Sequence, residues 1–454
     1  MKPETMTSAL RVRPREAIVD VPAIDTYFRY EREHGLGEAV EMCNGAGVCR
    51  KMKGGTMCPS YRATLDERHA TRGRGNALRL AITGQLTANR WNDAETEATL
   101  DLCLSCKACK SECPANVDLA TYRSEFLSHY YENHARPLEA YAFGMIDRWA
   151  RLGSAFPRLA NAATRAPGID ALIRRMLHLA DEREMPRLAP STFRRWARHN
   201  GVPAAGRRPR KPLSPPPAGR DIILWADTFN NYFHPETAVA AYEVLGAAGF
   251  SVSVPHGHFC CGRPLYDFGM LTRAKTYLRR IMDGLGEEID AGCPVVVLEP
   301  SCASVFRDEL RNLFPDNPRA ERLRRQTFVL SEFLARHAPQ YAPALPRTVL
   351  LHGHCHQKAV IKMDHEVGLL QRMGADVQMP DAGCCGMAGP FGFGADKIAV
   401  SKAVGERVLL PAVRQSSADT LIVADGFSCQ EQISQLTGRR AIHLAEALRM
   451  ALRT

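Results

Sequence analysis

The stretch DLCLSCKACKSECP, residues 101–114, places four cysteines in the pattern Cys-x-x-Cys-x-x-Cys-x-x-x-Cys-Pro: Cys103, Cys106, Cys109 and Cys113. Two-residue spacers let one loop wrap three thiolates around one face of an iron–sulfur cube, while the fourth cysteine points to a second cluster. A zinc site is the alternative, but four cysteines this close with a following proline favour iron–sulfur. The pattern therefore requires a second cysteine block to complete both clusters.

That second block precedes the first, within EMCNGAGVCRKMKGGTMCPSY, residues 41–61. By the same crossover arrangement, one 4Fe-4S cluster takes Cys103, Cys106, Cys109 and Cys58, and the other takes Cys43, Cys49 and Cys113. The second set is one thiolate short, because Ala46 stands at the middle position of its triplet. A 3Fe-4S cluster and a 4Fe-4S cluster with a non-cysteine ligand or an exposed iron remain open alternatives.

A basic turn and a helix pattern separate the two blocks, RATLDERHATRGRGNALRLAITG at 62–84. Two interpretations of its arginines stand side by side. Arg72 and Arg74 either fix the cluster loops or dock a partner, or they belong to a solvated helix face.

The composition sets the limits of the fold. With 454 residues, 45% hydrophobic and 24% charged, the chain should form about three domains with real cores, which excludes a peptide, a disordered tail or a coiled coil. Its fifteen cysteines are an odd number, which weakens a disulfide framework. Neither a signal peptide nor a run of eighteen apolar residues is found, so we expect a cytoplasmic protein.

The positive charge favours an anionic partner. A net charge of +10 fits an acidic subunit, a nucleic acid or a membrane surface, the last as peripheral contact with the inner face. We expect no nucleic-acid partner, because only the charge favours one.

Domain boundaries follow the cysteine-free gap between Cys113 and Cys260. Within it, apolar spacing predicts helices over 137–199, and Pro, Gly and basic residues at 201–220 are typical of a linker. Its basic centre, 207–211, is interpreted as a solvated tether. We expect an extension (1–36), a two-cluster domain (37–136), a helical connector with linker (137–220) and two lobes (221–340 and 341–454).

Both lobes repeat one order of elements. DIILWADTF at 221–229 predicts a buried strand, and a helix, a strand, Cys260-Cys261-Gly262, a helix and a strand before Cys302 follow. The second copy starts at RTVLLHGHC (347–355) and contains Cys384-Cys385-Gly386 and a strand before Cys429. Strands alternating with helices predict two α/β lobes with parallel sheets, related by duplication.

The lobe cysteines should gather at the carboxyl edges of these sheets. Lobe 2 offers four thiolates, Cys355, Cys384, Cys385 and Cys429, with Cys355 and Cys429 at strand ends. Lobe 1 offers three, Cys260, Cys261 and Cys302, with Asp227 in the place of Cys355. Each set is a candidate metal site. Nearby imidazoles add possible ligands or ordinary packing: His354, His356, His256 and His258. Cys293 lies outside the repeat, and we expect it to be a buried thiol.

Several motifs resemble one group of iron–sulfur proteins: CNGAGVC (43–49), MCPSYRAT (57–64), the 101–114 stretch, CCGRPLYD (260–267), LEPSCASVFRDEL (298–310) and HGHCHQKAV (352–360). The paired Cys-Cys-Gly lobes resemble the cysteine-rich domain of heterodisulfide reductase subunits, of iron–sulfur subunits of glycolate oxidase and anaerobic glycerol-3-phosphate dehydrogenase, and of lactate-utilisation proteins. The N-terminal block resembles their helical two-cluster ferredoxin domain. The match spans roughly 37–454 and is strongest to the cluster half of FAD-linked dehydrogenases of the D-2-hydroxyglutarate type.

This resemblance implies an electron-transfer subunit of a flavin-dependent 2-hydroxyacid dehydrogenase, the non-flavin component of an oxidoreductase acting on CH–OH donors. FAD is expected on a partner dehydrogenase subunit, because no dinucleotide fingerprint follows a strand here. Electrons would pass to a quinone or a soluble carrier.

The alternative is a thiol–disulfide or quinone reductase with the Cys-Cys-Gly lobes as its active site. The full lobe motif ends in Cys-x-x-Cys, but Glu299 and Gly426 stand at its first position here, which disfavours non-cubane clusters. One metal or cubane cluster in lobe 2, or an apo lobe whose cysteines and histidines shape a pocket, fits better. A structural zinc protein is the third class.

Overall fold

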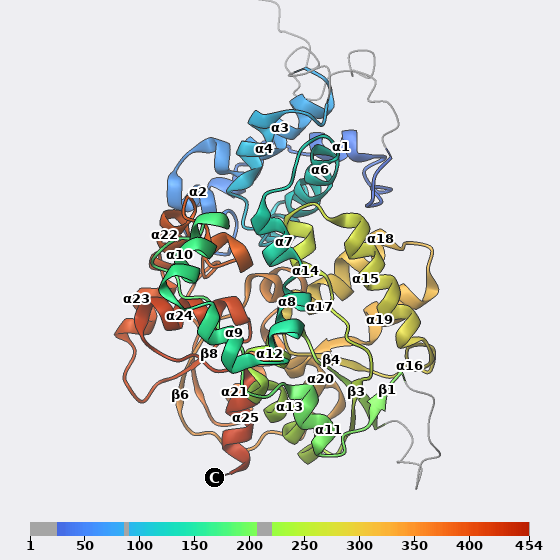
Figure 1. Ribbon diagram of the computed structural model, residues 1–454, viewed down its shortest axis with the longest axis vertical. Helices are drawn as coiled ribbons and strands as arrows, with labels where there is room; N and C mark the ends of the chain where they lie inside the picture. Colours follow the sequence, from blue (N-terminus) through green and yellow to red (C-terminus); the bar gives the residue numbers. More distant parts are fainter. Residues whose placement is uncertain (1–24, 86–89, 207–219, 454) are drawn as a thin grey trace, which may run out of the picture.

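The computed structural model describes residues 25–85, 90–206 and 220–453 (Figure 1). Most of the expected 1–36 extension and the tether at 207–211 lie outside these residues. Four parts are named here by their residues: the N-terminal module (25–136), the connector (137–206), lobe 1 (220–340) and lobe 2 (341–453). No helix among the described residues is long and apolar enough to cross a bilayer.

The N-terminal module is helical. Its elements are α1 (Leu36–Glu41), η2 (Val48–Arg50), α2 (Pro59–Thr64), η3 (Glu67–His69), α3 (Thr71–Ile82), α4 (Ala94–Asp101), α5 (Ala108–Glu112) and α6 (Leu119–Asn133). The side chains of Asp93 and Asp118 accept hydrogen bonds from backbone N–H groups in the first turns of α4 and α6. Pro59 begins α2, where its missing N–H leaves no hydrogen bond unmade. Short capped helices therefore separate the cysteine-bearing loops.

The connector consists of α7 (Leu138–Gly144), α8 (Ile146–Gly153), α9 (Pro157–Ala163), α10 (Pro167–Met176) and α11 (Phe193–His199). Helices α7 to α10, green in Figure 1, cross the face of the molecule from the N-terminal module toward the lobes. The expected helices over 137–199 are thus present.

Lobe 1 holds a parallel sheet in the order β1-β3-β2-β4-β5. Its elements are β1 (Ala204–Ala205), contributed by the connector, β2 (Asp221–Trp225), α12 (Thr228–Tyr232), α13 (Pro235–Ala247), β3 (Ser251–Pro255), α14 (Arg263–Asp267), α15 (Leu271–Gly284), α16 (Gly286–Asp290), β4 (Val295–Val297), α17 (Pro300–Ser304), η4 (Val305–Glu309), α18 (Leu310–Leu313), α19 (Pro318–Gln326), β5 (Thr327–Val329) and α20 (Leu330–His337). In register, Ile223 lies between Ser253 and Val295.

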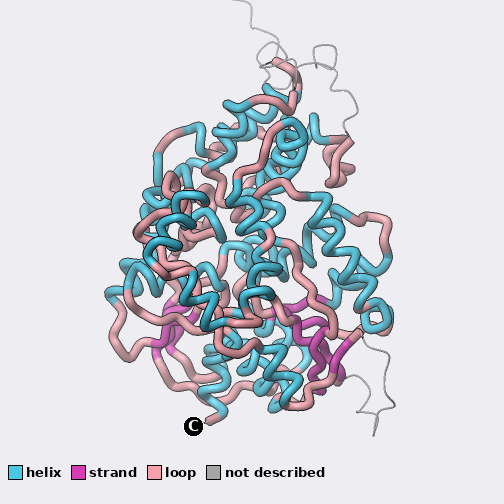
Figure 2. Tube along the Cα trace, viewed as in Figure 1, coloured by secondary structure: helices cyan, strands magenta, loops and turns pink. Residues whose placement is uncertain are grey.

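Lobe 2 holds a parallel sheet in the order β7-β6-β8. Its elements are β6 (Thr348–Leu351), η5 (Gln357–Ile361), α21 (Asp364–Arg372), β7 (Asp376–Gln378), η6 (Gly389–Phe393), α22 (Ile398–Glu406), α23 (Leu409–Gln415), β8 (Leu421–Val423), α24 (Phe427–Thr437) and α25 (Leu444–Leu452). The two sheets form separate magenta groups in Figure 2, on the side opposite the helical module.

A helical N-terminal region followed by an α/β region with parallel sheets is thus confirmed. The strand expected over 221–229 is too long, because the Asp227 carboxylate accepts from the N–H groups of Phe229 and Asn230 and starts α12. The strand-end placement of Cys355 and Cys429 is also wrong. Both cysteines lie in the first turn of the helix that follows a strand.

The parts share hydrophobic cores. One cluster of buried side chains runs from Leu78 in the N-terminal module through Leu278 in lobe 1 to Ile433 in lobe 2. A second cluster joins the two lobes, with Leu245 and Leu448 among its members. Because the buried apolar clusters extend from one part to the next, the four parts are packed against one another.

The segment 103–109, a loop that runs into the first turn of α5 and is called the motif loop below, is anchored in lobe 1 by ion pairs. The Lys107 ammonium, only 1% exposed, lies 2.5 Å from Asp308 and 2.8 Å from Glu309. Lys110 contacts the other oxygen of Asp308 at 2.5 Å. Burial lowers the pKa of Lys107, but the two acidic charges outweigh it and raise the pKa overall. An unpaired ammonium at this depth would be strongly unfavourable.

Asp308→Asn should therefore destabilise the protein by about 3–5 kcal/mol, because it removes half of the charge that compensates Lys107. Denaturant unfolding followed by circular dichroism measures the change.

The matched control is Asp316→Asn. Asp316 forms an exposed ion pair with Arg29 at 3.2 Å, so its loss should change stability by less than about 1 kcal/mol. Equal effects of the two substitutions would contradict the role assigned to the buried ion pair.

Candidate iron–sulfur and metal centres

Four N-terminal cysteines influence one another electrostatically. Burial raises the pKa of Cys106 well above its ordinary value, and the charges of Cys355, Cys109 and Cys58 raise it further. Burial likewise raises the pKa of Cys109, with contributions from Asp118, Cys103 and Cys58. Clustered buried thiols resist ionisation unless a cation joins them. This donor set therefore suits a positively charged metal centre.

Arg74 fixes the loop that carries Cys58. Its fully buried guanidinium donates to Cys58 Sγ at 3.5 Å, to Ser60 Oγ at 2.9 Å and to the Thr99 carbonyl at 3.2 Å. A solvated-face interpretation is wrong for this residue, whose cation lies directly against a cysteine sulfur. The backbone of Arg72 hydrogen-bonds Cys49, so both arginine positions contact the cysteine loops.

The other N-terminal cysteines form a looser set. Burial raises the pKa of Cys49, and the charges of Cys58 and Cys43 add to the effect. Cys113 is half-buried, and its N–H donates to the Cys109 carbonyl at 3.1 Å. Cys49 thus lies near both Cys43 and Cys58.

The motif loop also meets both lobes. The carbonyl of Ser105 accepts a hydrogen bond from His356 Nε2 of lobe 2 at 2.8 Å and one from the Arg263 guanidinium of lobe 1 at 3.4 Å. Because the charge of Cys355 is the strongest electrostatic influence on Cys106, a lobe 2 cysteine neighbours the N-terminal cysteines. The sequence pattern alone had predicted separate sites for the N-terminal cysteines and the lobe 2 cysteines.

In lobe 1, two cysteines lie in contact. Cys261 Sγ and Cys302 Sγ are 2.8 Å apart and buried, and the N–H of Gly262 donates to Cys260 Sγ at 3.4 Å. Burial raises the pKa of Cys302 to about 12, with the charge of Asp227 contributing. The three predicted lobe 1 cysteines are therefore brought together, next to the buried Asp227.

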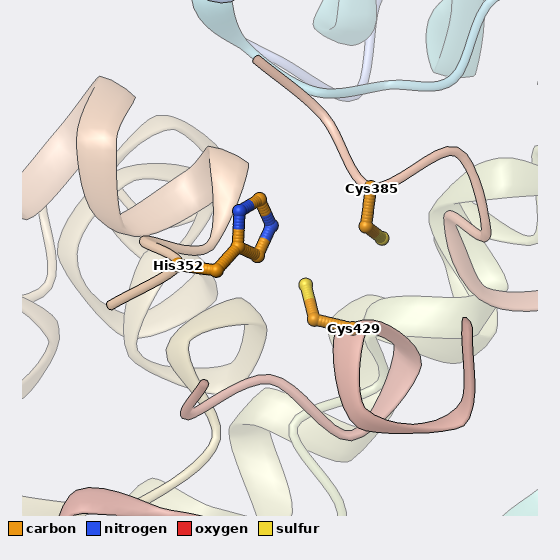
Figure 3. Close-up of side chains that lie close together, drawn as sticks. All are labelled: His352, Cys385 and Cys429. Atoms are coloured by element: carbon orange, nitrogen blue, oxygen red, sulfur yellow. The ribbon is translucent and has the colours of Figure 1, made fainter. Parts of the chain in front are cut away.

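Lobe 2 contains a tighter donor set. The ligand atoms of His352, Cys385 and Cys429 all lie within 4.8 Å of one another and are buried. In Figure 3 the two sulfur atoms and the His352 ring point toward a common centre. Hydrogen bonds from Cys384 and Cys429, then the His352 imidazole, lower the pKa of Cys385 well below its usual range. Two thiol sulfurs and an imidazole nitrogen match the ligands that zinc or iron prefers.

Cys355 and Cys384 border this set. The side chains of Cys384 and Cys355 hydrogen-bond, and the charge of Cys355 also acts on Cys429. The Lys358 ammonium donates to the carbonyls of Ala382 and Gly383, beside the Cys-Cys-Gly turn.

The glycine of each Cys-Cys-Gly turn has a geometric cause. Gly262 and Gly386 have φ values of 80° and 95°, a region that disfavours side chains. A Cβ on Gly386 would also lie 2.2 Å from the Ser401 carbonyl oxygen. In both turns the glycine N–H donates to the first cysteine sulfur at 3.4 Å. The same backbone turn thus presents the cysteine pair in each lobe.

The histidines singled out from the sequence have other partners. His356 donates to Ser105, and His354 Nδ1 accepts from the backbone N–H of His356 at 3.2 Å. Burial lowers the pKa of His258 to about 4, and its Nδ1 is 3.2 Å from Tyr232 Oη. His256 accepts from Arg194 through its carbonyl. His352 was missed, although it directly follows a buried strand in the run LHGHCH and so faces the same sheet edge.

Glu299 bridges the lobes at the position where the full Cys-x-x-Cys lobe motif has its first cysteine. Its carboxylate accepts from Ser301 N at 3.1 Å and from Phe427 N of lobe 2 at 2.9 Å. Burial, with the charge of Asp227, raises the pKa of Glu299 to about 7. A carboxyl group therefore occupies the ligand position between the two cysteine sets.

Two family comparisons agree with this geometry. Residues 39–117 match the 4Fe-4S dicluster domain, and residues 227–307 match the cysteine-rich domain. The chain combines a 4Fe-4S dicluster domain with a cysteine-rich domain. The first match contains all seven N-terminal cysteines, and the second contains Cys260, Cys261 and Cys302.

Relatives of this iron–sulfur, cysteine-rich protein include dehydrogenases. It is 26% identical to the D-2-hydroxyglutarate dehydrogenase of Pseudomonas putida over 89% of its own length and 42% of the relative. It is also 26% identical to one component of the anaerobic glycerol-3-phosphate dehydrogenase of Escherichia coli, over 71% of this chain and 79% of that component. Lactate utilization protein A of Bacillus licheniformis is 29% identical over half of this chain and 98% of the relative. The chain spans about two fifths of the length of the D-2-hydroxyglutarate dehydrogenases it matches.

Glu299 should make the stability of this iron–sulfur protein depend on pH. Its pKa is about 7 in the folded state against about 4.3 in an unfolded chain, so folding favours the protonated acid. The resulting stabilisation is present below about pH 4 and is lost as pH rises through 7, by up to about 4 kcal/mol. Glu299→Gln should reduce this pH dependence, as measured by denaturant unfolding at pH 5 and pH 8.

Glu287→Gln, at an exposed position of α16, is the control and should keep the wild-type pH dependence. An unchanged pH profile in Glu299→Gln would contradict the assignment.

Proposed function

We propose that this chain is the iron–sulfur electron-transfer component of a flavin-dependent 2-hydroxyacid dehydrogenase. A partner subunit binds FAD and oxidises the hydroxyacid, and this chain passes the electrons to a quinone or a soluble carrier. One observation carries the proposal: the loop that bears Cys103 and Cys106 contacts both lobes, because the Ser105 carbonyl accepts from His356 of lobe 2 at 2.8 Å and from Arg263 of lobe 1 at 3.4 Å. A chain of neighbouring cysteine sites is what stepwise transfer requires. The similarity to dehydrogenases and to a dehydrogenase component supports it.

The ligand sets of the two clusters are part of the proposal. One 4Fe-4S cluster takes Cys58, Cys103, Cys106 and Cys109, the group whose thiols act on one another. The second takes Cys43, Cys49 and Cys113, as a 3Fe-4S cluster or as a 4Fe-4S cluster with a non-cysteine ligand or an exposed iron. When bound, such clusters supply one-electron transfer, which divides the two-electron oxidation of a flavin into single steps.

The residues around Cys58 and Cys106 set the conditions for that transfer. Arg74 holds a positive charge against the Cys58 sulfur, at 3.5 Å. Burial of Cys106 and Cys109 keeps water away from the site. The Lys107 ion pairs and the His356 hydrogen bond to Ser105 hold the motif loop against both lobes.

We further propose a metal centre in lobe 2, held by His352, Cys385 and Cys429 with Cys355 and Cys384 beside it. The low pKa of Cys385 supports it, because a metal binds the thiolate form. Cys260, Cys261 and Cys302 form the matching candidate site of lobe 1. Duplication of the lobes and the domain boundaries at 37–136, 137–220, 221–340 and 341–454 belong to the same proposal. The similar turns at Gly262 and Gly386 support the duplication.

Peripheral contact with the inner face of a membrane is proposed through the connector. Large exposed apolar side chains concentrate there: Leu138, Tyr141, Trp149, Leu152, Phe156, Leu159, Ile169, Leu172 and Met176. The exposed Arg151, Arg158 and Arg175 on the same helices suit anionic lipid headgroups.

A thiol–disulfide or quinone reductase is the second candidate. It is favoured by the contact between Cys261 Sγ and Cys302 Sγ at 2.8 Å. Cys261→Ser would abolish a reductase that works through this pair while leaving the N-terminal clusters intact.

Cys106→Ser should remove one cluster and interrupt electron flow. We expect a loss of about four iron atoms per chain and at least about tenfold slower dye reduction by the chain with its copurified flavoprotein and a 2-hydroxyacid. Iron analysis and low-temperature EPR of anaerobically prepared protein measure the first effect.

Cys293→Ser is the matched control, because Cys293 Sγ donates to the Asp221 carbonyl at 3.4 Å, outside the proposed ligand sets. Dye reduction that never depends on the hydroxyacid, with full iron content and bound flavin, would refute the electron-transfer proposal.

His352→Ala should lower the zinc or non-cluster iron content by about one atom per chain, because it removes one of three converging donors. His365→Ala, in α21, serves as the control. Unchanged metal content in His352→Ala would exclude this imidazole as a ligand.

A further inference from the structure

An apolar cavity lies between the connector and both lobes. Its volume is about 280 Å³, near the lower end of the range of small-molecule sites, and one side is open to solvent. The connector contributes Phe143, Ile146 and Trp149, lobe 1 contributes Phe229 and Phe233, and lobe 2 contributes Phe393 and Phe427. The rings of Phe229 and Phe427 stack with centroids 4.6 Å apart. We call this space the connector pocket.

Several residues that line the connector pocket are close in sequence to the lobe cysteines. Met387 follows Cys385 by two residues, and Ser428 directly precedes Cys429. Pro264 of lobe 1, three residues after Cys261, lines the pocket as well. Since consecutive Cα atoms are about 3.8 Å apart, the backbone of the pocket wall lies within roughly 4–8 Å of Cys385 and Cys429. A molecule in the pocket would therefore be close to the lobe 2 centre.

The lining selects a neutral, apolar occupant. The charged residue in the lining is Glu431, which pairs with His234 at 3.5 Å, so the lining offers an anionic ligand no cation. The Asn161 amide is occupied by both backbone groups of Leu188, at 2.8 and 3.0 Å. Ser428 Oγ accepts from Gly389 N at 3.2 Å, and a hydroxyl that accepts in this way can still donate its own hydrogen. The pocket thus offers aromatic walls and the Ser428 hydroxyl as a hydrogen-bond donor.

The cavity also has an apolar exit. Trp149 lines the pocket and is 49% exposed, and the exposed Leu152 and Phe156 follow it along α8 and the start of α9. An alkyl tail attached to a ring in the pocket could leave along these side chains. A soluble carrier protein has no way into such a cavity.

We propose that the connector pocket binds a quinone with an apolar side chain, and that this quinone is the terminal electron acceptor. The inference rests on the proposed function, because the cysteine centres must supply the electrons. Two electrons, delivered singly, and two protons from solvent convert the quinone carbonyls to the hydroxyls of the quinol. The reduced flavin of the partner is the electron source, and it is reoxidised. The Ser428 hydroxyl donates a hydrogen bond to one quinone carbonyl.

Ala160→Trp tests the pocket by filling it, since Ala160 lines it from α9. The full chain with its clusters is reduced by dithionite, freed of excess reductant and mixed with decyl-substituted benzoquinone, and recovery of visible absorbance gives the reoxidation rate. Ala160→Trp should slow reoxidation by at least about tenfold. Ala162→Trp, on the exposed side of the same helix, should leave the rate unchanged, and ferricyanide should reoxidise all variants equally.

Binding is measured separately from electron transfer. The same benzoquinone should quench the fluorescence of Trp149 saturably in wild-type protein, weakly in Ala160→Trp, and with smaller amplitude in Trp149→Phe. Absence of saturable quenching, or equal reoxidation by quinone in Ala160→Trp and Ala162→Trp, would overturn the proposal.

The quinone-pocket proposal and the electron-transfer proposal are tested with different sources of electrons. Because dithionite replaces the flavoprotein, a pocket that fails this test leaves hydroxyacid-dependent dye reduction intact. A chain that receives no electrons from a flavoprotein can still pass the pocket test.

Discussion

Burial of the Lys107 ammonium requires compensating carboxylates, and both come from lobe 1, roughly 200 residues further along the chain. This ion pair fixes the motif loop, and the loop in turn presents Ser105 to His356 and Cys106 to Cys355. Since charge compensation at this depth tolerates little displacement, the dicluster domain has one orientation relative to the lobes. The neighbouring cysteine sites depend on that orientation.

Most of what could be predicted from the sequence came from the spacing of its cysteines and of its strand and helix patterns. The 101–114 pattern, the two Cys-Cys-Gly turns and the alternation of strands and helices depend on short-range geometry, and the helical and parallel α/β regions were predicted from them. The contact of Arg74 with Cys58 and the position of His352 depend on tertiary packing, which local patterns do not encode. The strand at 221–229 was overextended because hydrophobicity continued past the residue, Asp227, whose side chain begins a helix.

Glu299 shows what a missing cysteine means physically. The carboxylate stands where the full Cys-x-x-Cys motif has its first cysteine, but it accepts from two backbone N–H groups, one from each lobe. Glu299 therefore links the two lobes through hydrogen bonds, at a position where a cysteine thiolate could have bound a metal. Lobe 2 instead gains an imidazole at His352, within 4.8 Å of two sulfurs. The two lobes share one turn geometry around Gly262 and Gly386 but differ in donor chemistry.

Cys106 is far in sequence from the lobe residues that bury it, and this separation has a consequence for biosynthesis. Residues 308, 309 and 356 leave the ribosome roughly 200–250 residues after the motif loop, on the order of tens of seconds later at about 5–20 residues per second. Throughout that interval the dicluster cysteines are already synthesised while the lobes that bury them are not. The nascent chain thus has a window in which iron and sulfide can be delivered, and docking of the lobes closes it.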